Sequence, residues 1–280
     1  MTPVVPLSRF SRLVDGLDHP ECVTWGPDGF VYAGGEAGQI YRVSLEGQVE
    51  QVGSTGGFVL GLCLDGRGNV YACDSGRGAV MVMSATGAVH CYFSGPNGSG
   101  LVSPNYPVFD RVGNLYVSES GDFHADNGRL WVVRPGGYGE VFREDVVSFP
   151  NGMALDNDEE FLYVVVSTLP GVVRVPLRGG AVEVVLTFGE KVPDGVAFDS
   201  EGNLYVSCYT PDEIWRVDHE RRLDLFASDW ESVVLAEPTN IAFCGPKLDT
   251  LVVGSLGRWH LSQAKLNIIG QPYNYPELPE

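Results

Sequence analysis

An internal repeat constrains the fold of this chain more than any other feature. Six short apolar runs recur along the 280 residues, and each run ends at a residue that we use as an anchor. The anchors are Gly26, Asp65, Asp110, Asp156, Asp199 and Cys244. Subtraction of neighbouring numbers gives intervals of 39, 45, 46, 43 and 45 residues. A near-constant period of this length is typical of a propeller or of another array of repeated units.

Each copy of the repeat contains short runs of β-branched or aromatic residues, separated by Gly, Asp, Asn or Pro. In the fifth copy we expect four strands, at residues 196–198, 203–208, 213–218 and 223–227. The residues between them suit hairpin turns. A four-stranded unit repeated every ~40–50 residues predicts blades around a central channel. No stretch has a sustained helical period, so the predicted fold is an all-β, six-bladed β-propeller.

The two ends of the chain complete this scheme. The sixth copy shows three strands, near residues 241–244, 251–254 and 259–263, and the segment 8–14 can supply a fourth. A strand from the N-terminus would close the ring and remove two exposed sheet edges. We therefore expect a single domain over residues 1–280. It comprises a lead-in and closing strand at 1–19, six repeats at 20–264 and a Gly/Pro/Asn-rich tail at 265–280.

The composition limits the classes of partner. Asp and Glu number 36 against 18 Lys and Arg, a formal net charge of −18, whereas nucleic-acid binding requires a basic surface. The first residues lack the features of a signal peptide, and no apolar run approaches the ~18 residues that span a membrane. The six cysteines show no CxxC spacing, which indicates reduced, buried side chains. We expect a cytoplasmic protein with a small-molecule substrate and without nucleic-acid or membrane partners, its oligomeric state being open.

The position five residues before each anchor marks the point where the chain reaches the innermost strand of each copy. In a closed propeller these positions surround one end of the central channel, and we call them the channel register. The register is occupied by Glu21, Leu60, Asn105, Asn151, Asp194 and Thr239. Four of these six side chains offer a carboxylate or carboxamide oxygen, and the geometry of a propeller makes them converge.

A single Asn or Asp after Pro is common in turns, where its side chain bonds to the nearby backbone. Glu21 is in no such turn, and four oxygen donors at one register are what a divalent cation requires. Such donors with two formal negative charges suit Ca²⁺ first and Mg²⁺ or Mn²⁺ next. Zn²⁺ is less natural without His or Cys at the register, and Fe²⁺ is left open. The predicted metal ligands are Glu21, Asn105, Asn151 and Asp194.

Substrate contacts are expected from the loops that join second and third strands at the same end of the channel. The longest of these loops, residues 118–128, contains Asp122 and His124. His124 is a candidate proton shuttle or hydrogen-bond donor, although a lone loop histidine is often plain surface. The other candidates to line the pocket are Asn105, Tyr106, Ser167 and Tyr209.

Several segments resemble the regucalcin/gluconolactonase family of six-bladed propellers, which includes luciferin-regenerating enzymes. They are Pro20-Glu21-Cys-Val-Thr-Trp25, Phe149-Pro-Asn-Gly-Met-Ala-Leu155, Val192-Pro-Asp-Gly-Val-Ala-Phe198, Asn203-Leu-Tyr-Val-Ser207 and Leu256-Gly-Arg-Trp-His260. The resemblance implies a divalent metal held by Glu21, Asn151 and Asp194, with Asp194 as the base in lactone hydrolysis. Related calcium propellers that cleave phosphotriesters, such as diisopropyl fluorophosphatase, carry a second Asn that Asn105 resembles. The animal members active on gluconolactone have an arginine where this chain has Ser103.

The resemblance and the register together predict a metal-dependent lactonase that acts on a sugar-acid lactone or a related small lactone. The metal would polarise the carbonyl, and an activated water would attack it. Two alternatives stay open. One is a calcium-dependent phosphotriesterase or esterase of the diisopropyl fluorophosphatase type. The other is a non-enzymatic binding propeller, or a metal-free one similar to strictosidine synthase.

Overall fold

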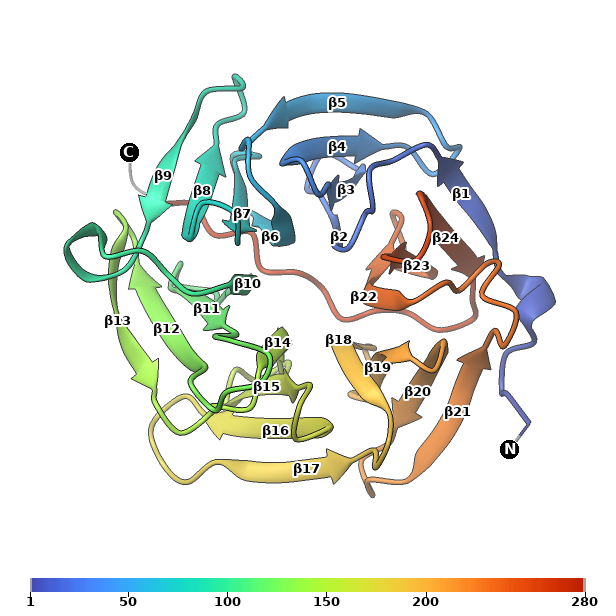
Figure 1. Cartoon of the computed structure of the whole chain (residues 1–280). Coiled ribbons are helices and arrows are strands. Elements are labelled where there is room, and N and C mark those ends of the chain that lie inside the picture. Colours follow the sequence, from blue (N-terminus) through green and yellow to red (C-terminus); the bar gives the residue numbers. More distant parts are fainter. Residues whose placement is uncertain (1, 279–280) are drawn as a thin grey trace.

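The computed structural model describes residues 2–278 and contains six four-stranded antiparallel sheets arranged as blades in a ring (Figure 1). This confirms the predicted all-β, six-bladed propeller. The helical elements among these residues are two short 3₁₀ turns, η1 (Leu7–Arg9) and η2 (Pro96–Gly98). No helix in the described part of the chain is long and apolar enough to cross a membrane.

The first three blades follow one another along the chain, each with its innermost strand first. The first blade contains β2 (Val23–Trp25), β3 (Val31–Gly34), β4 (Gln39–Val43) and β5 (Val49–Ser54). The second contains β6 (Val59–Leu64), β7 (Val70–Asp74), β8 (Ala79–Met83) and β9 (Val89–Phe93). The third contains β10 (Pro104–Phe109), β11 (Leu115–Glu119), β12 (Arg129–Arg134) and β13 (Tyr138–Arg143).

The remaining blades repeat this order until the ring closes. The fourth contains β14 (Pro150–Leu155), β15 (Phe161–Val166), β16 (Gly171–Pro176) and β17 (Glu183–Thr187). The fifth contains β18 (Val192–Phe198), β19 (Leu204–Thr210), β20 (Glu213–Val217) and β21 (Leu223–Ser228). The sixth contains β22 (Pro238–Cys244), β23 (Thr250–Ser255), β24 (His260–Lys265) and, as its outer strand, β1 (Ser11–Asp15). Closure by an N-terminal strand is therefore confirmed. This strand begins three residues later than we expected.

The anchor aspartates shape the hairpin between the first and second strands of a blade. In the third blade, Oδ1 of Asp110 accepts hydrogen bonds from the backbone of Val112 and Asn114 at 3.1 and 2.8 Å. Gly113 has a positive φ of 89° in this turn, a conformation that glycine adopts without a steric penalty. Asp65 and Asp199 make the same contacts in their own blades. The spacing Asp-x-x-Gly-Asn thus encodes the turn and accounts for part of the periodicity.

The hydrophobic core lies between neighbouring blades, with one cluster of buried side chains at each of the six interfaces. Between the fourth and fifth blades, for example, Val165 packs with Val196 and Val206, all at most 4% exposed. Burial of an aliphatic side chain of this size stabilises the fold by roughly 1.5–3 kcal/mol. The inner strands are therefore held rigidly, and so is the channel register that they carry.

The tail after β24 crosses the middle of the ring (Figure 1), and we call residues 266–278 the C-terminal strap. The strap binds the backbone carbonyl of the residue just before the anchor in five of the six blades. The acceptors are Trp25, Phe109, Leu155, Phe198 and Phe243. The register lies four residues earlier on each strand, roughly 10 Å away or more. The strap therefore covers the end of the channel opposite the register.

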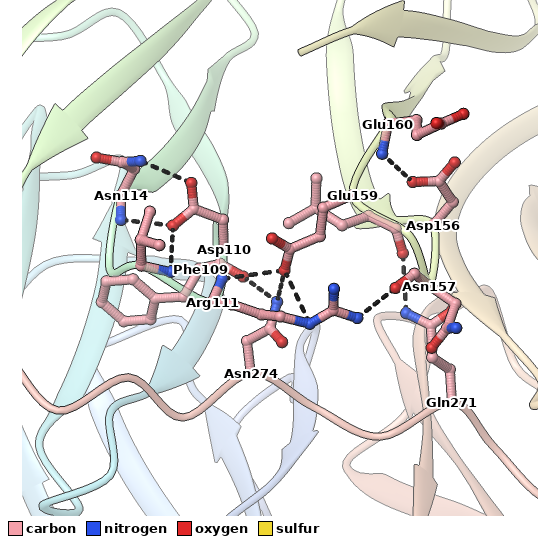
Figure 2. Close-up of polar contacts among 12 residues, drawn as sticks. Phe109, Asp110, Arg111, Asn114, Asp156, Asn157, Glu159, Glu160, Gln271 and Asn274 are labelled. Carbon is pink, nitrogen blue, oxygen red and sulfur yellow. Dashed lines mark hydrogen bonds and ion pairs between the residues drawn. The ribbon is translucent and has the colours of Figure 1, made fainter. Parts of the chain in front are cut away.

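Figure 2 shows the strap at the third and fourth blades. The side chain of Asn274 donates to the carbonyl of Phe109 at 2.9 Å and to Oε1 of Glu159 at 2.7 Å. The same Glu159 oxygen accepts the backbone N–H of Arg111 at 3.0 Å. Gln271 donates to the carbonyl of Leu155 at 3.0 Å. The strap thereby links the third and fourth blades, which are otherwise joined along the chain by a single connecting segment.

Candidate metal centre

The register residues are set into β-bulges at the start of the innermost strands. In the fourth blade, Pro150 pairs with Val166 and the next regular pair is Met153 with Val164, so Asn151 lies in the bulge between them. Equivalent bulges hold Asn105, Asp194 and Thr239. We expected the register where a loop reaches the strand, whereas in these four blades it lies inside the strand. A bulge frees a side chain from the regular alternation and can aim it at a site.

In the fourth and fifth blades, the glycine that follows the register residue has a packing role. A Cβ built on Gly152 would lie 2.7 Å from the backbone oxygen of Asp194. One built on Gly195 would lie 2.7 Å from the backbone oxygen of Thr239. The Pro-Asn-Gly and Pro-Asp-Gly segments are therefore not turns in this structure, although each sequence on its own is typical of a turn. They allow neighbouring inner strands to approach closely enough for the register side chains to meet.

Three of the four predicted ligands have a buried oxygen without a hydrogen-bond partner, namely Oδ1 of Asn105, of Asn151 and of Asp194. These residues are only 2, 3 and 7% exposed. Leaving such an atom unsatisfied costs about 1–3 kcal/mol, so buried polar atoms are nearly always paired. Three at one register fit a divalent cation, whose preferred donors are carboxylate and amide oxygens.

Glu21 completes the register at the first blade. It is 6% exposed, and its carboxylate has no hydrogen bond or ion pair with any described residue. Burial, followed by the charges of Asp194 and Glu36, holds the pKa of Glu21 well above its ordinary value. Burial also raises the pKa of Asp194 to about 7, against the opposing effect of a hydrogen bond from Asn151. Two such carboxyls can both ionise readily only when a positive charge lies between them.

The amide of Asn151 is oriented by two acceptors. Its Nδ2 lies 3.3 Å from Oγ of Ser167 and 3.3 Å from Oδ2 of Asp194. With the nitrogen engaged on that side, Oδ1 remains as the unpartnered atom. Ser167 also donates to the carbonyl of Pro193 at 2.8 Å, next to Asp194. One hydroxyl therefore helps to position both of these register residues.

Further hydroxyls link the register residues around the channel. Ser118 donates to the carbonyl of Asn151 at 2.8 Å, and Ser207 donates to that of Thr239. Thr239 in turn donates to the carbonyl of Glu21. Our sequence analysis did not identify Ser118 and Ser207, although each lies two residues after a tyrosine of the second strand, Tyr116 or Tyr205. That spacing, Tyr-x-Ser, was the signal that could have revealed them.

The other predicted pocket residues separate into two groups. Tyr209 lies half-buried near the register, where burial and then the charges of Glu237 and Asp194 raise its pKa. Tyr106 instead lines a cavity of about 100 Å³ between the inner strands and the C-terminal strap. Burial raises the pKa of Tyr106, so its phenol stays protonated within the channel.

The long loop of the third blade carries the remaining candidates. Asp122 accepts a hydrogen bond from Nδ2 of Asn127 at 3.0 Å, and its own N–H donates back to Oδ1 of Asn127 at 2.9 Å. These contacts close the loop on itself. His124 is exposed and packs edge-on against Phe123 at 5.3 Å. No hydrogen bond in the described residues joins His124 to the register.

A different cluster with metal-ligand atoms lies just before Glu21. Asp18, His19 and Glu36 have ligand atoms within 4.8 Å of one another. Nε2 of His19 accepts the indole N–H of Trp259 at 2.9 Å, so the proton of the neutral ring is on Nδ1. That nitrogen faces Asp18 at 3.2 Å and Glu36 at 2.9 Å. The ring therefore acts as a donor to both carboxylates, which explains the cluster without a metal.

Comparison with known proteins agrees with this architecture. The SMP-30/gluconolactonase/LRE-like region matches residues 19–257 of the chain. A curated relative, lactonase drp35 of Staphylococcus haemolyticus, is 30% identical over 112 residues, or 36% of this chain and 34% of its own length. The matches with this chain span only 34, 40 and 56% of the length of the curated relatives.

Solved structures of the same fold cover nearly the whole chain. A calcium-binding protein, regucalcin, from Agrobacterium tumefaciens has a TM-score of 0.80 at 17% identity, covering 99% of this chain and 100% of its own. The structure of a gluconolactonase from Xanthomonas campestris has a TM-score of 0.75 at 20% identity, covering 94% of this chain and 89% of its own. The family match spans most of the sequence, and this chain therefore belongs to the SMP-30/gluconolactonase/LRE-like family.

Proposed function

We propose that this protein is a divalent-metal-dependent hydrolase that opens a lactone. The observation that carries the proposal is the group of three unpartnered, buried oxygens on Asn105, Asn151 and Asp194, beside the buried carboxylate of Glu21. These residues would hold the cation, and an all-oxygen donor set favours Ca²⁺ over Mg²⁺ or Mn²⁺. The family supports hydrolysis, because it includes proteins named gluconolactonase and lactonase.

A bound divalent cation would polarise the lactone carbonyl and stabilise the negative charge that develops on its oxygen. Asp194 accepts a proton from the attacking water, whose oxygen bonds to the carbonyl carbon. The ring C–O bond then breaks, and the leaving oxygen takes the proton that Asp194 had accepted, which gives a hydroxy acid that ionises. The product is a hydroxy carboxylate, so each turnover releases one proton at neutral pH.

The surrounding residues support this chemistry by position. Ser167 orients Asn151 and holds the backbone beside Asp194. Tyr209 keeps its proton, because its pKa is raised, and it can donate a hydrogen bond to substrate. His124, on the exposed loop, is the alternative proton acceptor.

A second candidate function is hydrolysis of phosphotriesters by the same register. The observation in its favour is the unpartnered Oδ1 of Asn105, a second amide donor beside that of Asn151. A phosphoryl oxygen would take the place of the lactone carbonyl, with the register residues unchanged. A substrate panel separates the two functions.

We propose the cytoplasm as the location of this protein. All six cysteines are free thiols, four of them buried, Cys63 partly exposed and Cys91 exposed. Free thiols persist in reducing compartments.

Metal analysis of protein purified without chelator, followed by a proton-release assay, tests the proposed function. We expect close to one divalent cation per chain and turnover of at least one lactone, which a chelator abolishes and Ca²⁺ restores. The panel includes diisopropyl fluorophosphate as the phosphotriester. A protein that binds no cation and hydrolyses nothing in the panel would instead be a metal-free or non-enzymatic propeller.

A further inference from the structure

A groove of about 440 Å³ lies beside the register, between the third, fourth and fifth blades. This volume is in the range of small-molecule sites. Its walls come from the loop at residues 120–128, the connection between β15 and β16, and the connection between β17 and β18. The groove is open at the surface and uses none of the four predicted metal ligands.

The groove is continuous with the register through shared residues. Ser167 lines the groove and accepts the hydrogen bond from Nδ2 of Asn151. Val192 also lines the groove and begins β18, two residues before Asp194. A molecule whose reactive carbonyl meets the register would therefore extend its remaining part into this groove.

Phe123 forms part of one wall, and Phe149 packs against it. Phe123 is 48% exposed, and its ring meets that of Phe149 edge-on at 5.0 Å. Phe149 has a positive φ of 53°, which is unusual and strained for a bulky residue. This conformation places the ring against Phe123 two residues before Asn151. The wall of the groove and the orientation of a metal ligand thus depend on the same backbone segment.

The charges in the groove disfavour an anionic ligand. Lys191 is the one Lys or Arg among the described residues that line it, and its Nζ lies 2.8 Å from Oε2 of Glu213. The same ammonium group lies 5.2 Å from the ring centroid of Trp215. Asp126 and Glu190 add negative charge to the lining. Among the described residues that line the groove, no Lys or Arg is left without an acidic partner to offset the desolvation of a carboxylate or phosphate.

We infer that this groove binds an uncharged, apolar substituent of the lactone, an aryl or alkyl group that packs on Phe123. The inference rests on the proposed function, and it names the substrate class within it. The substrate would be a neutral lactone with an apolar side group, in preference to a lactone that bears a carboxylate.

Three lactones test the inference, namely an unsubstituted one, one with a phenyl substituent and one with a carboxylate. Their lactam analogues, which resist hydrolysis, are titrated by calorimetry to give a readout independent of turnover. We expect Phe123→Ala to weaken binding of the phenyl lactam, and to raise KM for the phenyl lactone, by about five- to tenfold. For the unsubstituted ligands, the affinity for the lactam and the KM for the lactone should each change less than twofold. Trp230→Ala, which removes an aromatic ring that is 90% exposed, is the matched control.

A second variant tests the charge argument. Glu213→Gln releases Lys191 from its ion pair, so the carboxylate-bearing lactam should bind several-fold more tightly to this variant than to the wild type. Preference of the wild type for that lactam, or equal effects of Phe123→Ala on all three ligands, would overturn the inference. If no lactone is turned over, the proposed function fails. Separately, if the phenyl lactam binds weakly and Phe123→Ala does not change its affinity, the groove is not the binding site of an apolar substituent.

Discussion

Nδ2 of Asn151 lies 3.3 Å from Oδ2 of Asp194, across the interface between the fourth and fifth blades. This contact engages one oxygen of the carboxylate and the nitrogen of the amide. The remaining Oδ1 atoms of both side chains are buried and unpartnered. Two residues that are 43 positions apart in the sequence are thus joined by a side-chain contact at the register.

Asp194→Asn separates the two roles of this carboxylate. The substitution keeps an oxygen donor of nearly the same shape, so part of the metal affinity should survive, while the group that accepts a proton from water is lost. We expect hydrolysis of a substrate lactone to fall by roughly 10²- to 10⁴-fold, measured as kcat at saturating metal. His124→Ala is the comparison variant. A larger loss in that variant with metal retained would move the base to the loop of the third blade.

Metal binding should depend steeply on pH. The pKa of Asp194 is raised to about 7 without metal, so a cation must displace its proton below that pH. Affinity should then fall by about tenfold per pH unit for each proton displaced. Calorimetry between pH 5 and 8, in buffers of different ionisation enthalpy, measures the protons released. Affinity independent of pH over this range would show that these carboxyls do not bind the metal.

The stability of the metal-free protein should show the opposite trend. A carboxyl whose pKa is raised in the folded state holds a proton that the unfolded chain has lost, so the stability contribution falls as pH rises from about 4 to 7. The raised pKa values of Glu21 and Asp194 both have this sign. Calorimetric melting with and without chelator should therefore show that the increase in stability caused by the metal becomes larger between pH 5 and pH 8.

Ser167→Ala tests the positioning of Asn151. The Ser167 hydroxyl is one of the two acceptors that orient the Asn151 amide, and it also donates to the carbonyl of Pro193. Both of these hydrogen bonds are lost in Ser167→Ala. Outer partners of this kind are typically worth 10- to 100-fold in metal affinity, and we expect a loss of about tenfold. Ser120→Ala removes a similar bond, from Ser120 to the carbonyl of Pro150 at 2.8 Å, without touching a ligand side chain. Equal losses in both variants would indicate a purely structural effect.

The C-terminal strap should contribute measurably to stability. Asn274→Ala removes the bonds to Phe109 and Glu159, and each bond of this kind is worth about 1 kcal/mol. A decrease of roughly 2–8 °C in Tm follows for a protein of this size. Asn157→Ala, at an exposed position of the neighbouring turn, should change Tm by less than 1 °C. An unchanged Tm in both variants would mean that the strap only rests on the ring.

The sequence predicted the ring because the signals were local and repeated. Asp110 and Asn114 lie four residues apart, and their turn recurs in other blades. The register positions could be predicted for the same reason, since each of the four predicted ligands follows a proline at a constant distance from its anchor. The start of β18 was missed because Pro193 was interpreted as a break. In the structure its missing N–H falls beside a bulge, where a sheet tolerates proline.

The strap, the hydroxyl chain and the groove were not predicted. The strap bond from Tyr275 to Trp25 joins residues 250 positions apart, and nothing in the local sequence indicates which carbonyl a tail side chain will reach. Phe123 was passed over because an aromatic residue in a polar loop has no periodic partner. Only the structure shows that Phe123 lines the groove and packs against Phe149.

The most direct test of the metal centre compares two glutamates on the same face of the propeller. Glu21 belongs to the register, whereas Glu36 belongs to the cluster with Asp18 and His19. Calcium affinity is measured by calorimetry for the wild type, Glu21→Gln and Glu36→Gln. We expect Glu21→Gln to weaken Ca²⁺ binding by about tenfold or more, because it removes one of two balancing charges, and Glu36→Gln to change it by less than threefold. Unchanged affinity in Glu21→Gln, or a larger loss in Glu36→Gln, would contradict the assignment of the register as the metal site.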